Sequence, residues 1–300
     1  MTPDLPATSK LALPGWPCQA RIRDDLAWIA VPRDPETAPD GLARVLDRLR
    51  AEFASMGYEF DEQPPSKLAL PVAGDGARWP NLLTRPRGSG PLHIVGAHYD
   101  AVPGTPGADD NASAVAALLH VMRCFAGKAT RSPVVFAAYS LEEYGYLGSR
   151  AHVEALRAAK TEVAGMVSLE MVGFTSERQE YPVGLSWFYP KHGRFVAVVS
   201  DWSSRPFLAR WAEGMRLAAG LDVQTLVVPG GGALVPAVRL SDHSPFWDAG
   251  YPALLVTDTS FYRNPHYHQP SDTLATLDVD FLARVAEGTA RALGRLVGVE

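Results

Sequence analysis

Side chains that can bind metal ions or transfer protons recur through the last two-thirds of this 300-residue sequence. They are carboxylates and imidazoles, and several directly follow apolar segments. In chain order they are His98, Asp100, Asp110, Glu142, Glu143, Glu170 and His268. If the ends of those segments converge, four of the carboxylates share one pocket, where they repel one another and raise one another's pKa values. Two divalent cations would balance three ligating carboxylates and one hydroxide and leave the fourth carboxylate free as a base. Imidazole and carboxylate ligands suit zinc.

The positions of these residues favour a functional site over more ordinary structural roles. A single histidine at a strand end is usually structural, but Asp100 can hold the second ring nitrogen of His98. Adjacent acids such as Glu142 and Glu143 usually mark a solvated helix start, yet here they follow the apolar segment PVVFAAYSL. Glu170 alone would be a weak signal. Together, on successive strand ends, these residues predict a metal site.

Apolar strand-like runs alternate with helical segments along the chain and carry these residues. We expect strands at residues 58–63, 81–84, 92–98, 133–139, 163–169, 195–199, 223–228 and 252–257. We expect helices at residues 19–30, 41–56, 113–125, 146–160, 206–219, 245–249 and 279–297. This alternation predicts an α/β sandwich, in which the carboxyl ends of the strands form the active-site edge.

The composition excludes several classes of protein. A net charge of −5 without basic clusters argues against nucleic-acid binding, and no apolar stretch is long enough to span a membrane. Cys18 and Cys124 are the only cysteines, and the N-terminus has no signal-peptide pattern, so we expect a cytoplasmic protein. No linker is evident, so we expect one domain over residues 1–300, with a helical part at residues 1–80 packing on the same core.

Six sequence blocks resemble the co-catalytic di-zinc aminopeptidases, whose relatives include glutamate carboxypeptidase, the glutaminyl cyclases and the transferrin-receptor ectodomain. The blocks are GAHYD, GADDNASA, SLEEYGYLGS, SLEMVG, SDHSPFWDAGYPALLVTDT and NPHYHQPSDT. They extend in order over roughly two-thirds of the chain, and the set is specific where a single block would not be. The resemblance implies a three-layer α/β/α sandwich around a mostly parallel mixed sheet. It also implies a peptide substrate and two Zn²⁺ ions per chain, with Co²⁺ or Mn²⁺ as substitutes.

The same resemblance implies a set of metal ligands. His98 and Glu170 would complete the coordination of one ion, Glu143 and His268 that of the other, and Asp110 would bridge the two. Relatives with established aminopeptidase activity usually carry aspartate where this chain has Glu170.

Catalytic roles follow from the resemblance in the same way. Glu142 would be the general base, taking a proton from a metal-bridging water and delivering it to the leaving amine. Asp100 would orient His98, and Tyr267 would polarise the scissile carbonyl. The implied activity is removal of the N-terminal residue from peptides.

Three other functions share this core. A metallocarboxypeptidase or aminoacylase would use the same two ions, and the unusual Glu170 keeps that reading open. A glutaminyl cyclase works with one zinc ion and needs fewer ligands than this chain offers. A non-catalytic module of the transferrin-receptor kind would have lost ligands, and none is lost here.

Overall fold

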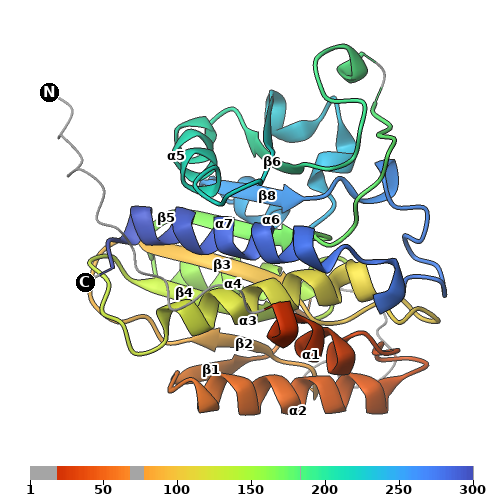
Figure 1. Ribbon diagram of the computed structural model, residues 1–300. Helices are drawn as coiled ribbons and strands as arrows, with labels where there is room; N and C mark the ends of the chain where they lie inside the picture. The colour runs from red at the N-terminus through yellow and green to blue at the C-terminus, as the bar shows by residue number, and fades with distance from the viewer. Residues whose placement is uncertain (1–18, 68–77, 183, 300) are drawn as a thin grey trace, which may run out of the picture.

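An eight-stranded mixed sheet forms the centre of the protein (Figure 1). The computed structural model describes residues 19–67, 78–182 and 184–299. The strands are β1 (Phe60–Gln63), β2 (Asn81–Thr84), β3 (Leu92–His98), β4 (Val134–Tyr139), β5 (Val163–Glu170), β6 (Val196–Asp201), β7 (Val223–Val228) and β8 (Ala253–Thr257). They lie in the order β1-β2-β4-β3-β5-β8-β6-β7, and four of the seven pairings are parallel. Three of those four join β4, β3, β5 and β8 in the middle of the sheet.

Helices cover both faces of the sheet (Figure 1). They are α1 (Gln19–Ile29), α2 (Pro39–Ser55), α3 (Ala114–Phe125), α4 (Leu147–Ala158), α5 (Arg205–Met215), α6 (Ser244–Asp248) and α7 (Val279–Val297). Successive residues of a strand point to opposite faces. On β3, Val95 belongs to the hydrophobic core formed with α1, α2, α3, α5 and α7. The preceding Ile94 belongs to a second core, which includes Val153 of α4 and Phe246 of α6. The molecule is therefore a three-layer sandwich.

The central strands are mainly apolar because both of their faces are buried. Such strands lack the alternating pattern of a half-exposed strand, and the continuous runs at β3, β4, β5 and β8 are of this kind. Parallel pairing then brings their carboxyl ends to the same edge. His98, the last residue of β3, pairs there with Tyr139 of β4.

The helices have local reasons to form where they do. On α2 the buried Leu42, Val45 and Leu49 recur at helical spacing, and Pro39 occupies the first turn, where its missing N–H costs nothing. The side chain of Asp278 caps α7 by accepting a hydrogen bond of 2.9 Å from the backbone N–H of Phe281. These helices position the sheet edge that carries the predicted site.

The predicted α/β sandwich and every predicted strand and helix are confirmed, with ends that differ by up to four residues. The largest difference is at α5, which ends at Met215 because the next residues form tighter turns, such as Leu217 N–H to the Gly214 carbonyl. Cys18 and the N-terminal segment inspected for a signal peptide lie outside the described residues. Among the described helices, none combines the length and apolar character needed to cross a membrane.

Candidate metal centre at the carboxyl ends of the central strands

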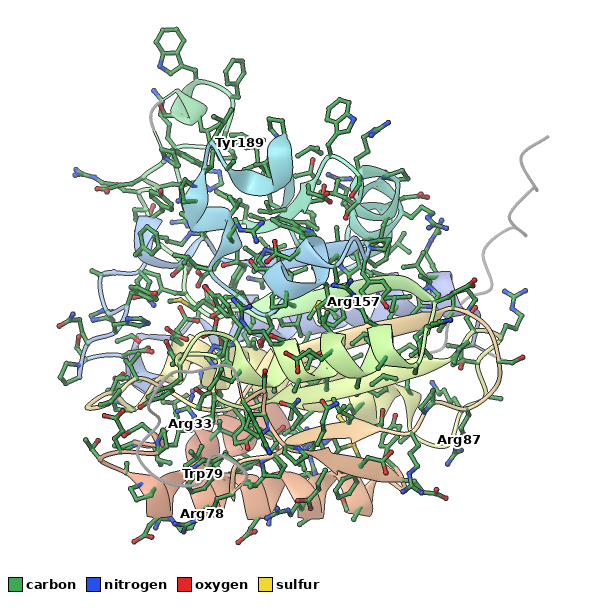
Figure 2. The ribbon with its side chains drawn as sticks, turned by 180° about the vertical axis from the view of Figure 1, so that it is seen from behind. Arg33, Arg78, Trp79, Arg87, Arg157 and Tyr189 are labelled. Atoms are coloured by element: carbon green, nitrogen blue, oxygen red, sulfur yellow. The ribbon has the colours of Figure 1, made fainter. Side chains whose placement is uncertain are left out.

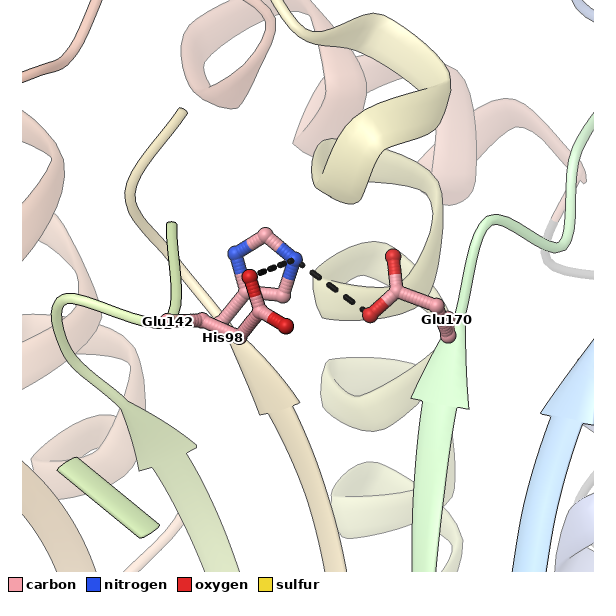
Figure 3. Close-up of side chains that lie close together, drawn as sticks. All are labelled: His98, Glu142 and Glu170. Carbon is pink, nitrogen blue, oxygen red and sulfur yellow. Dashed lines mark ion pairs between the residues drawn. The ribbon is translucent and has the colours of Figure 1, made fainter. Parts of the chain in front are cut away.

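The central strands deliver three of the predicted residues to one place. His98 ends β3, Glu170 ends β5, and Glu142 lies in the turn after β4 (Figure 3). Since β4, β3 and β5 are parallel neighbours, these side chains meet above the sheet edge. The side chains of all three residues are almost fully buried.

A second group lies beside the first. Asp110 lies in η2 (Ala108–Ser113), a short segment that leads into α3, and its own backbone is not helical there (φ −103°, ψ 90°). His268 comes from the loop after β8, and Glu143 directly follows Glu142. All five predicted ligands therefore converge on one cluster.

Asp110 and Glu170 lie at the distances from His98 that are expected for ligands of one ion. His98 Nε2 lies 3.4 Å from Asp110 Oδ1 and 3.4 Å from Glu170 Oε2. Two donor atoms bound to one tetrahedral zinc ion at about 2.0–2.1 Å stand about 3.3–3.4 Å apart. Each of these two pairs therefore has the spacing of two ligands on one ion. Among the described residues, the triads whose donor atoms all lie within 4.8 Å of one another are His98, Glu142 and Glu170, and His98, Asp110 and Glu143.

His268 has two carboxylate neighbours at similar distances, and one of them is again Asp110. His268 Nε2 lies 3.1 Å from Asp110 Oδ2 and 3.5 Å from Glu143 Oε2. The two oxygens of Asp110 thus face two different histidines. A carboxylate in this arrangement can bridge two ions.

Glu142 is placed differently from the ligands. Its Oε2 lies 3.9 Å from His98 Nε2, farther than the carboxylates of Asp110 and Glu170. Glu142, His98 and Glu170 are nevertheless close enough to form a metal-binding triad. Burial raises the pKa of Glu142 well above its usual range, and this effect outweighs the lowering by His98. A carboxyl group with a raised pKa is suited to hold and release a proton.

Electrostatics in the cluster favour a bound cation. Burial alone would lower the pKa of the His268 imidazole, but Asp110 and Glu143 outweigh it and raise that pKa to about 10. Burial, assisted by the Asp110 carboxylate, raises the pKa of Glu143 to about 7. Burial alone would raise the pKa of Asp110, but the two imidazoles hold it below its usual range. The raised pKa values mean that His268 and Glu143 tend to hold protons at atoms where a metal ion could bind instead.

The partners of these carboxylates support the same conclusion. In the described part of the chain, their ion pairs are with His98 and His268 and not with lysine or arginine. Glu143 Oε1 is buried and has no hydrogen-bond partner among the described residues. Buried carboxylates need cations, and oxygen and imidazole donors at this spacing fit zinc.

Asp100 lies where the sequence predicted, and it has a further contact. Its Oδ1 is 3.5 Å from His98 Nδ1, the ring nitrogen that it was expected to orient. Its two oxygens also accept backbone N–H hydrogen bonds from Glu142 at 3.1 Å and from Glu143 at 3.3 Å. Asp100 therefore holds the turn that carries the predicted base and lies beside His98, whose Nδ1 is buried without a hydrogen bond among the described residues.

Asn81 supports the site and was not predicted. It is the first residue of β2 and fully buried. Its Oδ1 accepts from the N–H of Ser140 at 3.0 Å, and its Nδ2 donates to the carbonyl of Gly148 at 2.8 Å. Asn81 thereby fastens both ends of the turn that contains Glu142 and Glu143. Its position in a short strand gave no sequence signal of this role.

Asp272 is a second unpredicted supporting residue. It lies four residues after His268, inside the block NPHYHQPSDT, which was the available signal. Its carboxylate accepts backbone N–H hydrogen bonds from Asp109 at 2.9 Å and from Asp110 at 3.1 Å. The loop that carries His268 is thus joined to the segment that carries Asp110.

Backbone strain is concentrated at the ends of these elements. Leu141, Met171 and His268 have φ values of 52°, 45° and 56°, in the left-handed region that non-glycine residues rarely adopt. Leu141 directly precedes Glu142, and Met171 directly follows Glu170. Such conformations persist where surrounding contacts impose them, and they cluster at functional sites.

Tyr267 lies beside the ligands. Its ring stacks on that of His268, with centroids 3.7 Å apart and planes inclined by 22°. It also lines the cavity described next, and burial raises the pKa of its hydroxyl group above the usual range. This position allows contact with a ligand in the cavity, whereas its predicted action on a carbonyl stays a prediction.

A cavity of about 380 Å³ opens beside the metal centre. Carboxylates and His268 line one part of it. The rest is mainly apolar and extends over β6, β7 and β8, with walls that include Tyr181, Phe195, Val199, Leu226, Val238 and Leu255. Among the described residues that line it there is no lysine or arginine.

Fold and site together define an α/β protein with a buried histidine–carboxylate centre. The model of peptidase family M28 matches residues 82–293, and the chain belongs to that family. It is similar to the uncharacterized protein YfbL of Escherichia coli, with 32% identity over 94% of this chain and 90% of that protein.

Other relatives are more distant. Leucine aminopeptidase 1 of Fusarium vanettenii is 27% identical over 71% of this chain, which spans about half (54%) of that protein. The structure of the Legionella pneumophila LapA aminopeptidase superposes with a TM-score of 0.74 at 19% identity, over 93% of this chain and 72% of that one. The latter likeness shows the shared fold.

Proposed function

We propose that this protein is a metallo-aminopeptidase that binds two zinc ions and removes the N-terminal residue from peptides. The observation that carries the proposal is the position of Asp110, whose two oxygens face two separate histidine–carboxylate groups at 3.4 Å and 3.1 Å. His98 and Glu170 would complete one coordination shell, and Glu143 and His268 the other. Co²⁺ or Mn²⁺ would substitute for zinc in such a donor set.

The surrounding residues supply the proton transfers. Bound zinc ions supply Lewis acidity, which acidifies the attacking water and polarises the scissile carbonyl. Glu142 takes the proton of that water and returns it to the leaving amine, for which its raised pKa and its position beside the ligands suit it. Asp100 holds His98 and the turn of Glu142 in register. Tyr267 donates a hydrogen bond to the carbonyl oxygen as negative charge develops there.

The cavity explains why a free amino terminus would be recognised. Glu142, Glu170 and Glu180 line it, and carboxylates attract the α-ammonium group of a peptide. The apolar walls over β6 to β8 would receive the side chain of the residue that is removed. We therefore propose peptides with a bulky apolar N-terminal residue as substrates.

A metallocarboxypeptidase or aminoacylase is the second candidate function, because Glu170 departs from the aspartate usual in related aminopeptidases. A carboxypeptidase needs a cationic group to bind the carboxylate of its substrate. The described lining of the cavity offers no lysine or arginine for this purpose. The complete set of five ligands likewise disfavours a single-zinc glutaminyl cyclase.

Paired substrates test the proposal. The zinc-loaded protein would be assayed with leucyl and phenylalanyl anilides, with their N-acetylated counterparts, and with C-terminally blocked and free dipeptides. We expect hydrolysis of free-amino substrates and little hydrolysis of the acetylated ones. Preference for acetylated substrates would identify an acylase, and dependence on a free C-terminal carboxylate would identify a carboxypeptidase.

Two further features belong to the proposal. Helices α1 and α2 contribute to the same hydrophobic core as α3 and α7, which supports a single domain for the chain. The cytoplasmic location stays a prediction based on the sequence.

A further inference from the structure

Arg33 is a buried arginine outside residues 82–293, the range matched by the family model. It lies in the connection between α1 and α2, and its side chain, labelled in Figure 2, is 0% exposed. Burial of a guanidinium group is costly unless hydrogen bonds satisfy its donors. In the described part of the chain those donors are bound by main-chain carbonyl oxygens and not by a carboxylate.

Three of the four carbonyl groups that bind Arg33 lie at the two ends of one loop, and the fourth is that of Val31, at 3.2 Å. Its Nε donates to the carbonyl oxygen of Tyr99 at 2.9 Å. Its Nη2 donates to that of Gly107 at 2.8 Å, and its Nη1 donates to that of the preceding proline. The loop begins directly after the ligand His98 and ends three residues before the bridging ligand Asp110. The planar guanidinium group of Arg33 therefore sets the distance between the two ends of the loop.

The loop approaches Arg33 closely along its path. The backbone N–H of Ala101 donates to the carbonyl oxygen of Arg33 at 3.2 Å. Gly107 has a φ of 55°, and a Cβ atom there would lie 2.2 Å from the carbonyl oxygen of Asp110 and 3.1 Å from Arg33 Nη1. Only glycine fits between the guanidinium and the bridging segment without displacing one of them.

The connection that presents Arg33 is itself firmly held. Asp34 Oδ1 accepts backbone N–H hydrogen bonds from Glu36 at 3.0 Å and from Thr37 at 2.6 Å. At the start of α2, a Cβ atom on Gly41 would lie 1.9 Å from the carbonyl oxygen of Pro32, so this turn packs directly against the helix. The N-terminal layer thus holds Arg33 in a fixed position.

We propose that Arg33 is a positioning residue of the metal centre: its guanidinium ties the two ends of the loop at residues 99–107 and holds His98 and Asp110 at the separation needed to share an ion. The proposal rests on the metal binding proposed above and extends the site to the N-terminal layer. Arg33 touches neither the substrate nor a metal, and it acts through main-chain carbonyl groups.

Cobalt-substituted protein tests this role with readouts other than activity. Arg33→Met keeps the length of the side chain and removes its donors. Arg33→Lys keeps the charge, but a single ammonium group cannot reach both ends of the loop. Arg123→Met is the matched control, because Arg123 is a largely buried arginine that binds Asp25 and Glu52 away from the centre. The visible absorption of bound Co²⁺, the rate of its removal by a chelator and the thermal unfolding midpoint would be measured for all four proteins.

We expect both Arg33 variants to show an altered cobalt spectrum and to lose cobalt about 10–100-fold faster than the wild type, as is typical when support of a ligand is removed. Arg123→Met should unfold at a lower temperature but keep the wild-type spectrum and rate. A wild-type spectrum and rate of cobalt loss in Arg33→Lys would overturn the proposal, because a positive charge alone would then suffice to position the ligands. This variant also decides the outcome if Arg33→Met does not fold. A wild-type protein that binds no cobalt would contradict the proposed function itself.

Discussion

Replacement of Glu170 by aspartate tests how closely the centre is fitted to its ligands. Glu170 Oε2 lies 3.4 Å from His98 Nε2 and accepts a hydrogen bond of 2.8 Å from Ser241 Oγ. Aspartate is one methylene shorter, which withdraws the carboxylate by about 1.5 Å along an extended chain. With an unchanged backbone its distance from His98 would grow to roughly 4.9 Å, well beyond the separation of about 3.4 Å for two donors on one zinc ion.

We expect Glu170→Asp to retain zinc through the remaining ligands and to lose about 10²-fold in kcat/KM, since misplacement by about 1 Å at a reacting centre has a cost of this order. Metal content and initial rates on a free-amino aminoacyl anilide provide the assay. Ser241→Ala is the matched control, because it removes the hydrogen bond and leaves the length of Glu170 unchanged, and it should lose less activity. Full activity of Glu170→Asp would refute the reasoning. Higher activity on free-amino substrates with lower activity on N-blocked ones would identify the wild type as an acylase or carboxypeptidase.

Three further predictions address the base, the ligands and the cavity. Glu142→Gln should keep its metal and lose about 10²–10⁴-fold in turnover, whereas Glu143→Gln should lose an ion. Metal analysis and rate measurements on both variants check this, and the reverse pattern would mean that the two roles are exchanged. Metal binding to the metal-free protein at about pH 8 should release protons, because the pKa of His268 is raised to about 10 and the bound form must be deprotonated. Affinity therefore rises as the pH rises toward that value, and calorimetry that gave the same enthalpy in buffers of different ionisation heat would contradict this. Ala197 of β6 also lines the cavity. Ala197→Phe should therefore place a ring there and raise KM for bulky apolar substrates by about tenfold or more while sparing alanyl substrates; an equal effect on both would argue against the proposed side-chain pocket.

The strands and helices that could be predicted are those whose apolar residues follow a regular pattern in the sequence. Continuous apolar runs marked β3, β4, β5 and β8, and helical spacing of apolar residues marked α2 and α7. Because parallel strands share an edge, His98, Glu142 and Glu170 were expected to meet, and their side chains do so. The orientation of β6, which runs antiparallel to β8, has no such signature in the sequence.

Asn81 and Arg33 were not predictable as supporting residues because their partners are main-chain groups far away in the sequence. Asn81 binds backbone groups near residues 140 and 148, and Arg33 binds carbonyl groups near residues 99 and 107. Such contacts depend on the final path of the chain and not on residue type or spacing. Asp100 was expected to orient a histidine, but its hydrogen bonds to the turn of Glu142 and Glu143 appear only once that turn is in place.

Titration of the metal-free protein with Zn²⁺ tests the central claim most directly. Bound metal and hydrolysis of a free-amino anilide would be measured in the same samples, with Glu142→Gln as a control that binds metal without turnover. We predict saturation at two ions per chain, with full activity only when both positions are filled. Saturation at one ion with full activity would contradict the two-ion centre. Saturation at one ion without hydrolysis would favour a single-zinc enzyme of the glutaminyl cyclase kind.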